Sequence, residues 1–170
     1  MAKILIDTKK CLELAEGIKQ FGGVPSDKED PMPYVFPEHV AQNGWWAMVA
    51  INQQTTPVVG PALKGWVKGQ PLRGWDYLLQ KAIYEANRNT EMFTREWLCG
   101  VNAEYLREIY YDENEGDTLS QAEVRASLLV DLGKFLERRG WSSVHEAYLE
   151  SEGYILRSDG RGLAQILAET

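Results

Sequence analysis

The sequence predicts an all-α fold, an irregular orthogonal helical bundle in a single domain that spans residues 1–170. Apolar residues recur at helical spacing in most segments, and residues that start or end helices stand at the ends of these segments. No segment shows the long alternation of apolar and polar residues that indicates a strand. With 44% hydrophobic residues, the chain can bury the core of one domain.

The first predicted helix ends at Gly22-Gly23, and a proline-rich loop or extended arm, residues 24–37, follows it. The second predicted helix begins at Pro37, which suits the first helical position, and ends near Pro57. Its predicted buried face consists of Val40, Trp46, Val49 and Ala50. Gly and Pro recur from Pro57 to Gly74, so this segment is a long connection with room for extended pieces.

The third predicted helix has the clearest apolar stripe of the chain. The stripe consists of Trp75, Leu78, Leu79, Ala82, Ile83 and Ala86. Thr94 and Asn102 are each expected to cap a short helix, because their side-chain oxygens can accept an amide of its first turn.

Two capping boxes mark helices in the last third of the chain. They are formed by Ser120 with Glu123 and by Ser143 with Glu146. The first box leads into an apolar stripe from Val124 to Leu136, and Gly140 is expected to end this helix. A last short helix is predicted near residues 163–167.

Residues 112–123, DENEGDTLSQAE, begin and end with an acid, as a calcium loop of the EF-hand type does. The fifth position is Gly116, which has no side-chain ligand. The sixth position is Asp117, where such a loop needs a positive φ that favours glycine. We therefore expect no metal here and interpret the stretch as an acidic turn before the first capping box.

Charge and cysteine content argue against several classes of function. The net charge of −7 opposes binding to polyanionic nucleic acid. Cys11 and Cys99 stand alone, without a CxxC motif or a His at ligand spacing, so both are predicted to be reduced thiols. The sequence shows no secretion signal, and its longest apolar run, residues 45–51, is too short for a bilayer. We expect a cytoplasmic protein without a membrane partner.

Five stretches in the chain resemble, in the same order, segments of one known family. They are KILIDTKKCLELAEGI, WWAMVAINQQTTP, RGWDYLLQKAIYEA, FTREWLCGVNAEYLREIYYD and LSQAEVRASLLVDLGKFL. The last one has Glu123, Arg125, Gly133 and Lys134 at the family's spacing. The family is that of the queuosine salvage proteins, the queuosine 5′-phosphate N-glycosylases. The resemblance implies an all-helical fold related to the helix-hairpin-helix DNA glycosylases, and cleavage of a bond between 7-deazaguanine and ribose without a cofactor.

Two departures from the family pattern bear on activity. The family has Asn-Phe and further aromatic residues where this chain has Asn52 followed by Gln53, Gln54, Thr55 and Thr56. Family members also continue for roughly another hundred residues beyond the point that matches Thr170. That part contains an FPxxxD segment whose acid is linked to catalysis. The resemblance therefore leaves three possibilities. A second polypeptide supplies this segment, the segment was removed, or the chain is a short relative with other chemistry.

Cleavage of an N-glycosidic bond needs a carboxylate near the ribose and flat or polar groups that hold the base. Asp76 is the candidate acid, although an acid in the first turn of a helix also stabilises the helix dipole. The candidates to stack on the base are Trp45, Trp46 and Trp75, with core packing as the alternative for each.

Polar candidates would hold the edge of the base and the 5′-phosphate. Asn52, Gln53 and Gln54 follow an apolar run, so they need partners if they are buried; a solvated helix end is the alternative. The candidates for a phosphate contact are Arg73, Lys64 and Lys68, with solvated surface charges as the alternative.

Three further residues are interpreted as structural or surface positions. Arg125 is expected to be a buried structural arginine rather than a phosphate contact, and His39 and His145 are expected at the surface.

Two other functions stay open. One is a base-excision DNA glycosylase, although the phosphate-binding GxG hairpin of such enzymes is missing from the sequence. The other is a non-catalytic helical subunit that needs a partner chain.

Overall fold

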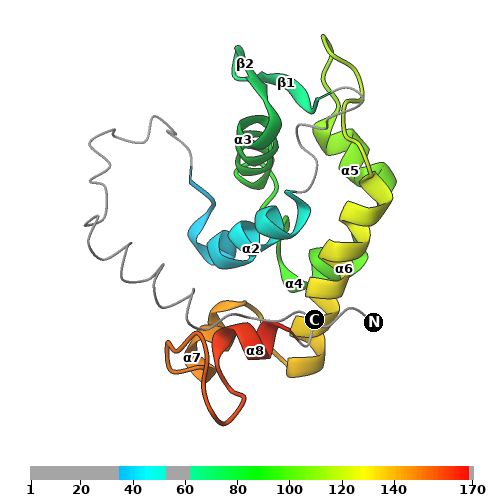
Figure 1. Cartoon of the computed structure of the whole chain (residues 1–170). Helices are drawn as coiled ribbons and strands as arrows, with labels where there is room; N and C mark the ends of the chain where they lie inside the picture. Colours follow the sequence, from blue (N-terminus) through cyan, green and yellow to red (C-terminus); the bar gives the residue numbers. More distant parts are fainter. Residues whose placement is uncertain (1–34, 53–61, 169–170) are drawn as a thin grey trace, which may run out of the picture. The chain divides into compact units, whose positions relative to one another are not determined.

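Helices make up most of the chain that the computed structural model describes, residues 35–52 and 62–168 (Figure 1). All of these residues belong to one compact unit, residues 34–170. The helical elements are η1 (Glu38–Val40), α2 (Ala41–Ile51), α3 (Gly74–Ala86), α4 (Arg95–Gly100), α5 (Ala103–Tyr110), α6 (Ala122–Arg139), α7 (His145–Glu150) and α8 (Leu163–Leu167). Within these ranges, no helix combines the length and hydropathy needed to cross a membrane. The first predicted helix lies outside the described residues.

A short β hairpin shows that the fold is not strictly all-α, so this part of the prediction is wrong. Strands β1 (Lys64–Val67) and β2 (Gln70–Arg73) pair antiparallel within the Gly- and Pro-rich connection. Lys68 and Gly69 both have positive φ, 48° and 79°, as tight hairpin turns require. Strands of four residues are too short for their alternation to stand out in the sequence, which explains the error.

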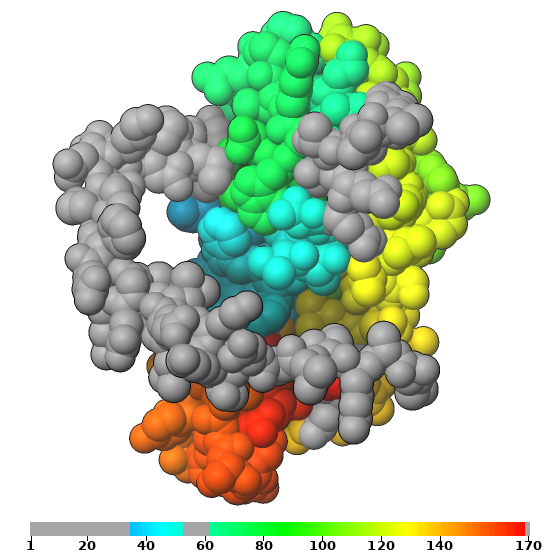
Figure 2. Space-filling view, viewed as in Figure 1, coloured from blue at the N-terminus to red at the C-terminus, as the bar shows by residue number. Residues whose placement is uncertain are grey.

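Of the buried face that the sequence predicts for this segment, Val40 is buried, but the α2 residues Trp46 and Val49 are not. The buried residues of α2 are Asn43, Gly44, Ala47, Met48 and Ile51. Trp46 and Val49 of the predicted face are 37% and 63% exposed, and Figure 2 shows α2 (cyan) at the surface beside α3 (green) and α6 (yellow). Because α2 is apolar on almost all sides, the spacing of its apolar residues does not indicate which face is buried. Close packing decides the buried face, since a Cβ at Gly44 would lie 2.9 Å from the ring of Phe36.

The predicted helix ends in the middle of the chain are confirmed. The side chain of Thr94 accepts the amide of Trp97 at 3.2 Å, and that of Asn102 accepts the amide of Tyr105 at 2.9 Å. Gly140 ends α6 with a φ of 69°. These caps fix the ends of α4, α5 and α6 from local sequence alone.

The first predicted capping box is wrong. Helix α6 begins at Ala122, two residues after Ser120, with Gln121 at its N-cap. The carboxylate of Glu123 instead accepts from Arg107 at 2.7 Å. The later start places Glu123 too early in the helix to reach back to the amide of Ser120.

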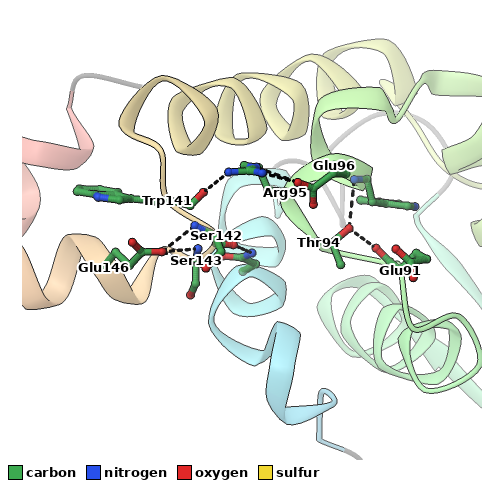
Figure 3. Close-up of polar contacts among 10 residues, drawn as sticks. Glu91, Thr94, Arg95, Glu96, Trp141, Ser142, Ser143 and Glu146 are labelled. Carbon is green, nitrogen blue, oxygen red and sulfur yellow. Dashed lines mark hydrogen bonds and ion pairs between the residues drawn. The ribbon is translucent and has the colours of Figure 1, made fainter.

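In the second predicted capping box, Ser143 with Glu146, the Glu146 carboxylate makes the expected bond to the Ser143 amide. Glu146 Oε1 accepts the backbone amides of Ser142 and Ser143 at 2.7 and 3.3 Å (Figure 3). In the same view, Arg95 at the start of α4 donates to the carbonyl of Trp141 at 3.2 Å. These bonds order the segment between α6 and α7 and join it to α4.

Helix α6 packs closely on α4 at Gly133. A Cβ at this position would lie 2.6 Å from the backbone nitrogen of Cys99 and 2.7 Å from the backbone carbon of Leu98. Only a glycine allows this approach without a shift of the α4 backbone. The resemblance singled out this glycine; its role in the fold is helix packing.

Arg125 is a buried structural residue, as predicted. Its side chain is 0% exposed, and its guanidinium donates to the carbonyls of Ile51 and Ser120, the second at 2.8 Å. Burial lowers the pKa of this guanidinium. Because Ile51 ends α2 and Ser120 precedes α6, Arg125 holds these two segments together.

The acidic stretch after α5 forms a tight turn in which Asp112 and Gly116 pair. The Asp112 carboxylate accepts the backbone amides of Trp66, Asn114 and Glu115 at 2.7, 2.9 and 3.1 Å. Burial acts to raise the pKa of this carboxyl, but the amide hydrogen bonds outweigh it, so the pKa is lowered. The first acid of the calcium-like pattern is thus a structural group that ties the turn to β1.

Candidate functional site

A mainly apolar pocket of about 270 Å³ opens between α2, α6 and α8. Its lining consists of Trp46, Val49, Ala50, Leu128, Asp131, Leu132 and Leu167. The α2 residues and the α6 residues of this lining both have the spacing i, i+3, i+4, which places three side chains on one face of each helix. The pocket therefore lies between two apolar helix faces, with α8 contributing a further apolar contact.

The outward face of α2 explains why the pocket has an aromatic wall. The inward face of this helix packs in the core, so Trp46 and Val49 keep 37% and 63% of their surface exposed. An indole of this exposure next to a pocket is a surface on which a planar ligand can stack.

Asp131 is the one charged side chain among the described residues that line this pocket. It is exposed on α6, between Leu128 and Leu132. An ionised carboxylate accepts hydrogen bonds only, so it would select a ligand that presents N–H or O–H groups. The sequence interpretation missed Asp131. The available signal was the run LLVDL, residues 128–132, in which an acid interrupts an apolar stripe.

The other α2 candidates lie outside this lining. Trp45 is 44% exposed, and its ring meets that of Phe36 edge-on, with centroids 5.7 Å apart. Asn52 is exposed and caps α2, where its backbone amide donates to Val49 at 3.4 Å. Gln53 and Gln54 lie outside the described residues.

Arg73, Trp75 and Asp76 lie together where β2 passes into α3. Arg73 is exposed at the end of β2, Trp75 is half-buried, and Asp76 is exposed in the first turn of α3. The lining of the α2–α6–α8 pocket includes none of them. In Figure 1 the start of α3 lies beside the hairpin, whereas α8 lies at the opposite end of the described unit. The structure therefore separates Asp76 from the pocket that Trp46 borders.

The two lysines considered for a phosphate contact also lie apart from the pocket. Lys64 on β1 forms an ion pair with Glu115 of the acidic turn. Lys68 in the hairpin turn lies over the ring of Tyr84, 5.9 Å from its centroid.

Both histidines are at the surface, as predicted. The ring of His39 bonds the carbonyl of Thr90 at 2.9 Å, and His145 stacks on Tyr148. In the described ranges, no three His, Cys, Asp or Glu side chains gather in the way that a metal site requires.

Comparisons with known proteins assign no family to this chain. No family model matches it, and no curated protein matches it at a significant level.

Proposed function

We propose that this protein binds a nucleotide of 7-deazaguanine salvage, queuosine 5′-phosphate, and acts on its base–ribose bond. The proposal combines the ordered resemblance to the salvage N-glycosylases with one structural observation. That observation is the pocket in which the indole of Trp46 and the carboxylate of Asp131 border an apolar space of about 270 Å³. This volume is near the lower limit for small-molecule sites, about 300 Å³, and suits a single base.

Both groups match the chemistry of a deazaguanine base. Its fused rings offer a flat face that can stack on the indole of Trp46. Its edge carries N–H donors, and the two oxygens of Asp131 can accept two of them. Leu128 and Leu132 would remove the rings from water on the opposite wall.

Hydrolysis also needs a carboxylate that acts on the ribose or on the attacking water. Asp76 remains the candidate that the sequence predicts, and Asp131 is the candidate that borders the pocket. Replacing each with Asn separates the two. Loss of hydrolysis with retained binding identifies the catalytic acid, whereas loss of binding identifies a base-recognition group.

Binding is tested by titrating tryptophan fluorescence with queuosine 5′-phosphate. Trp46→Leu is expected to weaken binding about tenfold or more, because stacking of a base on an aromatic ring contributes about 1–3 kcal/mol. Asp131→Asn is expected to have an effect of similar size. Trp45→Leu is the matched control, since it removes a neighbouring exposed indole outside the pocket. Equal effects of Trp45→Leu and Trp46→Leu would contradict the proposal.

Hydrolysis is measured by chromatographic detection of the free base, with queuosine 5′-phosphate and a base-modified DNA duplex as parallel substrates. Base release from the nucleotide alone supports salvage. Release from the duplex alone would support the DNA glycosylase alternative. Tight binding without release would favour a non-catalytic subunit that needs a partner chain.

A further inference from the structure

A second cleft, of about 340 Å³, lies between the β hairpin, α3 and the acidic turn, and it shares no lining residue with the α2–α6–α8 pocket. Three aromatic and three basic side chains line it. They are Trp66, Tyr84, Tyr111, Lys68, Lys81 and Arg88. This cleft, the hairpin cleft, has a polar and charged character that the first pocket lacks.

The three cations converge on one ring, that of Tyr84. Lys68 Nζ lies 5.9 Å, Lys81 Nζ 5.7 Å and Arg88 Cζ 5.1 Å from its centroid. Lys81 precedes Tyr84 by three residues on α3, so the two share a helix face. Arg88 follows Tyr84 by four residues, in the turn just after the end of α3. Lys68 joins them from the hairpin turn. This convergence stands out in a chain whose net charge is −7.

The lining also holds three acids, Glu85, Asp112 and Glu113, so the formal charges of the cleft sum to zero. Glu85 pairs with Lys81 at 2.9 Å. Asp112 is 8% exposed, and its carboxylate accepts hydrogen bonds from three backbone amides. Arg88 donates at 2.7 Å to the hydroxyl of Tyr84, and this hydroxyl is a neutral partner. Glu113 is the exposed carboxylate of the lining.

Two large rings border the same cleft and face water. Trp66 is 41% exposed and Tyr111 is 55% exposed. Exposed rings next to cations are the combination by which proteins hold a base and its phosphate, since the ring stacks and the cation binds the anion.

We propose that the hairpin cleft binds a mononucleotide, with its phosphate at Arg88 and Lys68 and its base against Trp66. This binding does not depend on glycosidase activity, and it uses no residue of the first pocket.

The test is a titration of the full chain with guanosine 5′-monophosphate, guanosine and inorganic phosphate, followed by two-dimensional NMR of the backbone and indole N–H groups. The monophosphate is expected to shift the Trp66 indole signal and to bind about tenfold more tightly than guanosine, because the phosphate adds charge-assisted contacts. Added salt is expected to weaken this binding.

Charge variants give opposite expected effects. Arg88→Gln is expected to weaken binding of the monophosphate about fivefold to tenfold, and Glu113→Gln to strengthen it about twofold. Arg138→Gln, an exposed arginine of α6 outside the cleft, is the matched control and is expected to change nothing. Trp46→Leu is expected to leave this binding intact, which separates the two sites.

Three results would overturn the proposal. One is equal affinity for guanosine and its monophosphate. Another is the same loss in Arg138→Gln as in Arg88→Gln. The third is much tighter binding of a 5′-phosphorylated oligonucleotide than of the mononucleotide, because the ligand would then be a nucleic-acid strand.

Discussion

Asn43→Ala is expected to lower the free energy of unfolding by about 3 kcal/mol. The Asn43 side chain is 2% exposed and makes three hydrogen bonds to distant backbone groups. Its Nδ2 donates to the carbonyls of Phe93 and Ser142, each at 3.1 Å, and its Oδ1 accepts the amide of Val144 at 2.9 Å. The residue therefore holds α2 against the segments before α4 and before α7.

The magnitude follows from the number of bonds. Each buried hydrogen bond contributes about 0.5–1.5 kcal/mol net, and alanine removes three together. The amide of Val144, a residue 1% exposed, would also lose its acceptor without gaining contact with water. In a unit of this size about 3 kcal/mol corresponds to a fall in Tm of roughly 10 °C.

The assay is urea unfolding of the wild type and variants, followed by far-ultraviolet circular dichroism. Gln42→Ala is the matched control, because Gln42 is the exposed neighbour on α2 and its loss should change stability by less than about 0.5 kcal/mol. Asn43→Asp keeps an oxygen that can accept the amide of Val144. It replaces the Nδ2 donor with a second carboxylate oxygen, which faces the carbonyls of Phe93 and Ser142 and cannot donate to them. This variant should therefore also destabilise the protein at neutral pH. A loss below about 1 kcal/mol in Asn43→Ala would refute the reasoning.

Three further changes follow from the packing and the polar contacts. Gly133→Ala should lower the free energy of unfolding by about 1–3 kcal/mol, because the new Cβ would lie 2.6 Å from the α4 backbone. The measurement is thermal unfolding, and the control is Gly100→Ala, whose Cβ would have no atom within 4 Å. Thr94→Val should remove the α4 cap and cost about 1 kcal/mol in the same experiment, and no change would contradict the cap. Asp112→Asn should lower stability at neutral pH by about 1–2 kcal/mol. Because the folded pKa of Asp112 is lowered, the wild type should lose this advantage as the pH falls from the unfolded pKa through the folded one, and a pH-independent difference would contradict it.

The sequence predicts those elements whose signals are local. The caps at Thr94 and Asn102, the stop at Gly140 and the apolar stripe of α3 each depend on residues within a few positions, and the structure confirms them. The capping box at Ser120 fails because α6 begins only at Ala122, and the carboxylate of Glu123 pairs instead with Arg107, sixteen positions earlier. The β hairpin fails because its strands have four residues each.

Features that depend on tertiary contacts could not be predicted. The face that α2 buries is decided by Phe36 against Gly44 and by the partners of Asn43, which lie 50 to 101 positions away. The sequence marks Trp46 as a candidate to stack on a base, and Trp46 borders a pocket. It does not mark Asp131, because Asp131 becomes part of a pocket only through the packing of α2 near α6.

The most direct measurement of the central claim is a crystal structure of the protein soaked with queuosine 5′-phosphate. The account predicts that the base lies between α2 and α6, stacked on Trp46, with an edge N–H about 3 Å from the carboxylate of Asp131. A base bound only in the hairpin cleft or beside Asp76, with the pocket at Trp46 empty, would contradict it.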